Sequence, residues 1–177
     1  MRTTLMIATL AILAGCHHHH DVDDPPASWY ITYGNGHPLA ASPDDGFIVS
    51  QESDLASRIN NHRVSNGIPA LIDQGSLRDV ARAHSIHMAI HDFESDINPE
   101  GDSPADRADA AGIGFSALGE NIVYDWADAS DAYWEMINDP GMHANIDDPN
   151  FWYFGVGYEH DSGSYWNDYW TVMFREP

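Results

Sequence analysis

The chain has 177 residues, and its 28 aspartates and glutamates outnumber its 7 arginines, with no lysine, to give a formal net charge of −21. Such an acidic chain is not a nucleic-acid-binding protein, because phosphate contacts need clustered Lys or Arg. It is not a disordered acidic tail either, because 43% of the residues are hydrophobic and include 6 Trp, 8 Tyr and 6 Phe, enough to fill a core. The length is that of one domain of common size.

The first fifteen residues have the pattern of a secretory leader. One positive charge precedes the apolar run from Leu5 to Leu13, which is too short to span a bilayer. The run ends in Leu13-Ala14-Gly15-Cys16, which resembles a bacterial lipobox, whose cysteine becomes the lipid-modified N-terminus. We therefore predict a lipoprotein signal peptide over residues 1–15 and lipidation of Cys16, with acyl chains that anchor the protein to a membrane. An ordinary signal peptide with an incidental cysteine is the alternative.

Residues 16–51 are predicted to form a tether and N-terminal extension. Four histidines follow Cys16, and the next segment is rich in Asp, Pro, Gly and Ser, a composition typical of an extended, self-repelling spacer. A lipid on Cys16 would hold the protein outside the cytoplasm, at the outer membrane or cell surface; without it the protein would be secreted. The globular domain is predicted over residues 52–177.

Four helices are predicted in the first part of this domain. Ser53 can cap the first, which Gly67 and Pro69 would end. The Ser-x-x-Asp spacing from Ser76 opens a second, and its apolar stripe includes His84, which we interpret as a hydrogen-bonded core residue rather than a metal ligand. The third would run from a Ser103 cap to residue 112, and the fourth over about residues 127–137, before Pro140.

Apolar and aromatic runs predict strands in the second part. They cover residues 120–124, 151–159 and 165–174, and the last two flank a polar turn and so predict an antiparallel hairpin. Helices clustered early and strands clustered late indicate a layered α+β fold.

Short motifs along residues 52–174 resemble, in their order and spacing, those of the CAP superfamily (cysteine-rich secretory proteins, antigen 5 and pathogenesis-related 1 proteins), also called SCP domains. They are residues 59–71, residues 81–85 with Met88, residues 98–104 with Arg107, Gly119-Glu120-Asn121-Ile122, residues 139–146, and Trp170-Thr171 with Phe174. The resemblance implies an α+β fold, a three-layer α-β-α sandwich with a central antiparallel sheet. It also implies a cleft lined by two histidines and two acids that can hold a divalent cation.

The chain departs from the family at both cleft histidines. The glutamate of the family's Gly-Glu-Asn motif is Glu120, and the second acid falls at Asp139. Asp96 stands at the position of the first histidine and Met142 at that of the second, with His143 one step later. The candidate cleft or metal residues are therefore Asp96, Glu120, Asp139 and His143, and no catalytic residue is assigned.

This altered set of ligands leaves three outcomes open. Three carboxylates suit Ca²⁺ or Mg²⁺ better than Zn²⁺, which prefers nitrogen and sulfur. A transition-metal site could instead recruit His143. The ancestral site could also be lost, with Met142 filling an apolar spot and Asp96 capping a turn. We expect His84, Arg107 and Asn121 to have structural roles, with Arg107 paired to one of the nearby acids.

Three functions remain open. The first is a lipid-anchored extracytoplasmic CAP-domain protein that binds a ligand or partner, with the membrane reached through Cys16 and with a lipid, sterol or envelope ligand. The sequence has no Gly-x-Ser-x-Gly elbow and no His-Glu-x-x-His zinc helix. The acid cluster still allows the second, a metal-dependent hydrolase acting on envelope or extracellular substrates. The many aspartates suggest the third, an acidic surface protein of a saline or calcium-rich environment.

Overall fold

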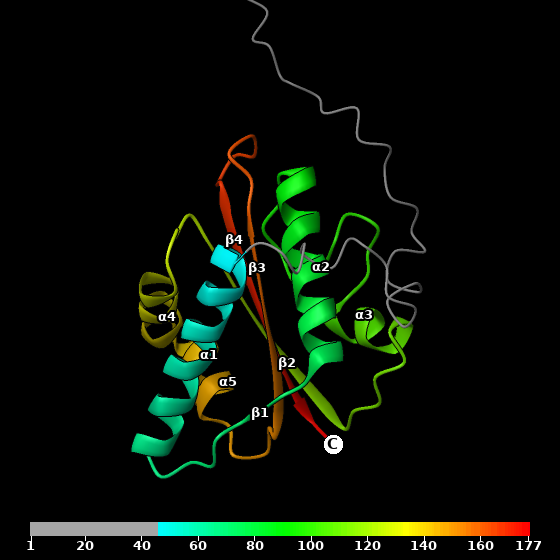
Figure 1. Cartoon of the computed structure of the whole chain (residues 1–177). Coiled ribbons are helices and arrows are strands. Elements are labelled where there is room, and N and C mark those ends of the chain that lie inside the picture. The colour runs from blue at the N-terminus through cyan, green and yellow to red at the C-terminus, as the bar shows by residue number, and fades with distance from the viewer. Residues whose placement is uncertain (1–45) are drawn as a thin grey trace, which may run out of the picture.

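The computed structural model describes residues 46–177, so the predicted leader, Cys16 and most of the predicted tether lie outside the described residues. The elements are α1 (Gly46–Ser65), β1 (Ile72–Asp73), α2 (Gly75–His91), α3 (Pro104–Ala110), β2 (Ala117–Tyr124), α4 (Ala129–Asn138), α5 (Pro140–Asp147), β3 (Tyr153–His160) and β4 (Asp168–Glu176). They form the predicted α+β fold (Figure 1). Within residues 46–177, none of the helices has the length and apolar character needed to cross a bilayer.

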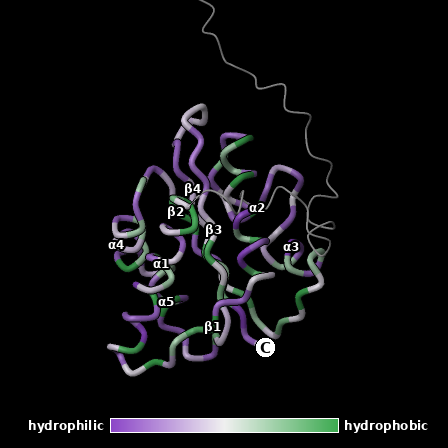
Figure 2. Tube along the Cα trace, in the orientation of Figure 1, coloured by the Kyte–Doolittle hydropathy of each residue, from purple (hydrophilic) through white to green (hydrophobic). Residues whose placement is uncertain are grey.

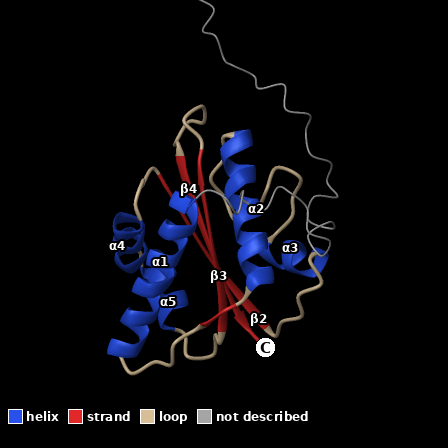
Figure 3. Ribbon diagram, viewed as in Figure 1, coloured by secondary structure: helices blue, strands red, loops and turns tan. Residues whose placement is uncertain are grey.

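The sheet lies between two layers of helices, with α1, α4 and α5 on one face and α2 and α3 on the other (Figures 1 and 3). Its strand order is β1-β3-β4-β2. The pairs β3–β4 and β2–β4 are antiparallel, which confirms the predicted hairpin. β1 instead pairs with β3 in parallel, through Ile72 and Asp73 alone. The sheet is therefore mixed and not wholly antiparallel, because the chain runs along β3 for two residues on its way into α2.

Side chains alternate between the two faces along the central strands. On β4, Trp170, Val172 and Phe174 pack with the larger core under α1, α4 and α5, whereas Met173 packs with α2. The smaller core on the α2 face is made of Leu77, Val80, Ala81, Ala108, Ile113 and Met173. Hydrophobic and hydrophilic residues are interspersed along the helices (Figure 2). The middle of α2 is buried on all sides, since residues 80–85 are consecutively buried.

Two glycines on β3 let α2 lie directly against the strand. A Cβ added at Gly155 would lie 2.2 Å from the backbone nitrogen of Arg78, and one added at Gly157 would lie 2.2 Å from that of Arg82. Arg78 and Arg82 are one helical turn apart, and the two glycines face the same side of the strand. The backbone of α2 therefore rests on β3 at two successive points.

A buried ion pair closes the outer edge of β3 beyond the short β1. Glu52 of α1 and Arg82 of α2 are 4% and 8% exposed, and the Arg82 Nε donates to Glu52 Oε1 at 2.7 Å. The same carboxylate oxygen accepts a hydrogen bond from the backbone amide of Tyr158 at 3.2 Å. The pair therefore joins helices of the two layers to the strand between them.

The helix starts differ in part from the predictions. α1 begins at Gly46, so Ser53 lies inside the helix and is not its cap. The turns of α1 before Ser53 pack on the domain. Ile48 belongs to the larger core, and the Gln51 side chain accepts a hydrogen bond from the amide of Ala129 at 2.8 Å. α2 begins at Gly75, where no side chain caps the helix, so the Ser76 prediction was also wrong.

The other helix ends follow the residues that the sequence singled out. Ser103 caps α3 in a capping box with Asp106, and Pro104 takes the first helical position, which confirms that prediction. α4 ends before Pro140 as expected. Pro140 then opens α5, a helix that was not predicted. Asp139 caps it by accepting hydrogen bonds from the amides of Gly141 and Met142, both at 2.8 Å.

Candidate functional site

Glu120 is held in a closed ion pair with Arg107. The two side chains are 2% and 0% exposed, and both carboxylate oxygens lie 2.7 Å from Arg107 Nη2. Arg107 Nη1 donates to the backbone carbonyls of Asp96, at 2.8 Å, and of Asp102, at 3.1 Å. The predicted pairing of Arg107 with a nearby acid is confirmed, and its partner is the glutamate of the Gly-Glu-Asn motif.

Burial has the largest effect on the pKa values of Glu120 and of the neighbouring His84. It raises the pKa of Glu120 to about 7, against the opposing effect of the Arg107 guanidinium, and the charge of Asp96 adds to the rise. His84 lies nearby, with its Nε2 3.9 Å from Glu120 Oε1. Burial, and secondly the charge of Arg107, hold the pKa of His84 well below its usual range. Its Nε2 donates to the carbonyl of Ser95 at 2.9 Å, so it is the hydrogen-bonded core residue that the sequence predicted.

Asp139, Met142 and Asn121 take structural roles. The carboxylate of Asp139 caps α5. The carbonyl of Met142 accepts from the Asn121 side chain at 3.0 Å, and the Met142 side chain packs against the larger core. Asn121 is fully buried and also accepts from Asn145 at 2.8 Å, so it ties β2 to α5. These contacts account for Asn121 and Met142 without a bound ion.

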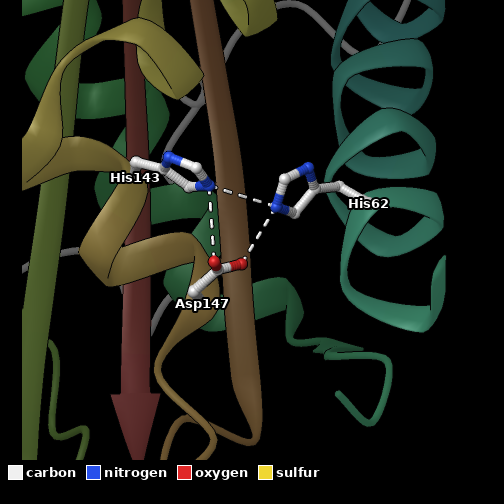
Figure 4. A group of neighbouring side chains, drawn as sticks. All are labelled: His62, His143 and Asp147. Atoms are coloured by element: carbon white, nitrogen blue, oxygen red, sulfur yellow. Dashed lines mark hydrogen bonds and ion pairs between the residues drawn. The ribbon is translucent and has the colours of Figure 1, made fainter. Parts of the chain in front are cut away.

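A different group of ligand atoms gathers between α1 and α5. His62 extends from α1 toward His143 and Asp147, which lie one turn apart on α5 (Figure 4). The Nε2 of His62 lies 2.9 Å from Asp147 Oδ1 and 3.3 Å from His143 Nε2, and the latter nitrogen lies 3.3 Å from Asp147 Oδ2. Within residues 46–177 this is the one group of three such ligands within 4.8 Å of one another, and it could bind a metal ion.

Tyr133 of α4 contacts His62 at the ring nitrogen that does not contact His143 or Asp147. Its hydroxyl lies 2.9 Å from the Nδ1 of His62. Burial raises the pKa of Tyr133, so the phenol keeps its proton at neutral pH. Three helices therefore contribute to the position of the His62 ring.

Of the four predicted cleft or metal candidates, only His143 belongs to this group. Asp96, Glu120 and Asp139 do not join it, so the structure does not gather the predicted oxygen-rich set at one point. The sequence analysis missed His62 and Asp147. The spacing of His143 and Asp147, four residues apart, is a recognisable helical pair. His62 lies 81 residues earlier than His143, and only the packing of α1 against α5 brings it there.

Comparison with known sequences identifies relatives in bacteria. The model of the cysteine-rich secretory protein (CAP) family matches residues 56–174. The uncharacterized protein YkwD of Bacillus subtilis is 30% identical over 119 residues, which are 67% of this chain and 46% of the relative. The uncharacterized membrane protein YlbC of the same organism is 26% identical over 109 residues, which are 62% of this chain and 32% of the relative. The chain thus spans less than half the length of these relatives.

Solved structures share the fold. An extracellular protein of Bacillus anthracis that contains an SCP domain superposes with a TM-score of 0.69 at 24% identity, over 80% of this chain and 45% of that one. An outer surface protein of Borrelia burgdorferi superposes with a TM-score of 0.66 at 16% identity, over 72% of this chain and 92% of that one. The fold and the match over residues 56–174 lead to one conclusion: the chain belongs to the cysteine-rich secretory protein (CAP) family.

Proposed function

We propose that the protein is an extracytoplasmic CAP-domain module that binds a lipid, sterol or other envelope ligand while a lipid on Cys16 holds it at a membrane. The secretory leader with its lipobox-like end supports the location. The names of the related structures agree with it, since one is an extracellular protein and another an outer surface protein.

The closed state of Glu120 is the observation that favours a binding module over a hydrolase. A general base must reach the proton that it takes, within hydrogen-bond distance of a substrate or water. The Glu120 side chain is 2% exposed and both its oxygens are bound by Arg107. Both carboxylate oxygens of the glutamate in the Gly-Glu-Asn motif are therefore engaged by a contact inside the protein.

An aromatic cluster at the loop between β3 and β4 offers a surface for such a ligand. The Trp166 ring lies 4.8 Å from that of Tyr124 and 4.6 Å from that of Tyr165, measured between centroids. Tyr165 is 73% exposed. Aromatic rings bury a large area and carry a polar group at the edge, which suits contact with lipid or sugar surfaces. In this proposal Tyr165 makes the first contact with the envelope ligand.

Replacing Cys16 with serine is expected to release the full chain from the membrane. The chain has a single cysteine, so no second site could be lipidated in its place. Membrane and soluble fractions of a bacterial host, with labelled fatty acid as a second readout, measure the effect. Ser28→Ala serves as a control in the same N-terminal region and should stay with the membrane. A wild-type protein that carries no fatty acid would contradict the anchor.

The released Cys16→Ser protein is expected to sediment with isolated cell envelopes, and Tyr165→Ala in that background to lower the bound fraction several-fold. Trp134→Ala is the matched control, because Trp134 is also an exposed aromatic but lies on α4. Equal binding of the two variants would remove the aromatic cluster from the proposal. Breakdown of envelope material that Glu120→Gln abolishes would favour a hydrolase instead.

A further inference from the structure

We propose that His62, His143 and Asp147 bind a borderline divalent cation, Zn²⁺ or a similar ion, and leave one coordination position open to solvent. This site lies away from the closed Glu120–Arg107 pair. It goes beyond the proposed envelope-binding role and does not depend on the anchor or on the ligand.

The distances among the two imidazole nitrogens and the Asp147 carboxylate fit such an ion. In a tetrahedral site with metal–ligand bonds of about 2.0–2.1 Å, neighbouring ligand atoms lie about 3.3 Å apart. Here the two Nε2 atoms are 3.3 Å apart, Asp147 Oδ1 lies 2.9 Å from the Nε2 of His62, and Asp147 Oδ2 lies 3.3 Å from the Nε2 of His143. The two imidazole nitrogens therefore already have the spacing of two tetrahedral ligands, and the carboxylate lies beside both of them, with one ligand atom of each residue within 4.8 Å of the others.

The chemistry of the ligands selects the ion. Two imidazole nitrogens with one carboxylate are a set used for Zn²⁺ and other borderline transition ions. Ca²⁺ and Mg²⁺ prefer sites made of oxygen, so the hard cations that the sequence analysis considered for the set of three carboxylates fit this group poorly. The two Nε2 atoms also face one another. A cation between them would use both lone pairs at once, whereas a hydrogen bond between them uses only one.

Tyr133 is an outer partner that suits His62 as a metal ligand. A metal bound at Nε2 requires the proton of the neutral ring to sit on Nδ1, where it can be donated to an outer partner. The Tyr133 hydroxyl lies 2.9 Å from that Nδ1 and can accept the proton's hydrogen bond. A hydroxyl can also donate a hydrogen bond, so this contact holds the ring in place and is compatible with the tautomer that binds a metal through Nε2.

The exposed fractions of the three side chains indicate on which side of the metal the open coordination position lies. His62 is 14% exposed, whereas His143 and Asp147 are 38% and 40% exposed. The inner ligand is thus shielded and the two outer ligands border on water. A site with three protein ligands keeps its fourth position for water or for a donor group from another molecule.

The test uses the full chain with Cys16→Ser and with each of His17 to His20 replaced by serine, because a run of histidines binds Zn²⁺ by itself. We expect one equivalent of Zn²⁺ to bind by calorimetry and to raise the melting temperature. Co²⁺ should give the intense visible absorption of a low-symmetry, near-tetrahedral ion. His143→Gln and Asp147→Asn should each abolish that absorption and weaken Zn²⁺ binding by about 100-fold or more, and Tyr133→Phe should weaken it by about 10-fold.

His160→Gln is the matched control. His160 also pairs with an acid, since its Nδ1 lies 2.8 Å from Asp168 Oδ1, but this pair belongs to no group of three ligands within residues 46–177. It should bind Zn²⁺ as the parent does. A parent that binds no Zn²⁺ would overturn the proposal. So would His143→Gln and Asp147→Asn variants that bind it unchanged, or displacement of Zn²⁺ by equimolar Ca²⁺. Near-UV circular dichroism without metal tests whether the substituted proteins keep the fold of the parent, which we expect because His143 and Asp147 are partly exposed.

Discussion

Gly157→Ala is expected to lower the free energy of unfolding by about 3 kcal/mol or more, and to leave much of the protein insoluble. Adding bulk to a packed core costs about 1–3 kcal/mol when side chains can adjust. Here the new Cβ would lie 2.2 Å from the backbone nitrogen of Arg82 and 2.3 Å from the carbonyl carbon of Ala81. Backbone atoms cannot rotate aside, so α2 would have to move off the sheet. Urea unfolding measures the effect.

Gly75→Ala is the matched control for this substitution. Gly75 begins α2, and a Cβ there would have nothing within 4 Å. Its effect should stay within about 0.5 kcal/mol, as for substitutions away from packed features. If Gly157→Ala proved as mild as Gly75→Ala, α2 would not be fixed against β3 by the close backbone approach described above.

Glu120→Leu is expected to destabilise the fold by about 3–5 kcal/mol at pH 8, because it leaves the guanidinium of Arg107 buried without a counter-charge. Arg107 is 0% exposed, and only backbone carbonyls would remain as its partners. Replacing both members, with Glu120→Leu and Arg107→Met, should restore much of that loss, because no charge is then buried. Simple additivity of the two single substitutions in urea unfolding would contradict the coupling.

The same carboxyl group should make stability depend on pH. Its pKa rises from 4.5 to about 7 in the folded protein, so the native state binds the proton more tightly than the unfolded chain. The stability from this group is therefore complete below pH 4.5 and is lost as the pH rises to about 7, by up to about 1.4 kcal/mol per pH unit. Glu120→Gln has no such titration, so its unfolding free energy should gain on that of the wild type between pH 5 and 8. Parallel profiles of the two proteins would contradict the burial effect.

The predictable parts of the fold rest on local chemistry. The Ser103 and Asp106 capping box and the hairpin of β3 and β4 were visible because short polar signals flank apolar runs there. The starts of α1 and α2 were not, since tertiary contacts override the local caps. Gln51 holds the first turns of α1 against α4, and β1 leads straight into α2. β1 has only two residues and so carries no period that a sequence could show.

The candidate site was also predictable only where it rests on neighbours along the chain. The Gly-Glu-Asn motif led to Glu120, and the loss of both family histidines led to the expectation of an altered cleft. His143 was a candidate because it follows Met142 in the motif. Its partners were not, because His62 lies on a distant helix and reaches His143 only through the packing of α1 on α5. A sequence motif records neighbours along the chain, whereas a metal site needs neighbours in space.

The contact of Glu52 with β3 affects whether the edge of the sheet can pair with a strand of another molecule. A strand edge with available N–H groups invites pairing with a strand of another molecule, which is a route to aggregation. β1 covers only the first two residues of β3. Further along that edge Glu52 occupies the amide of Tyr158, and Arg82 holds the carboxylate in place. A buried charge thereby occupies an edge amide that a strand of another molecule would need for edge-to-edge pairing.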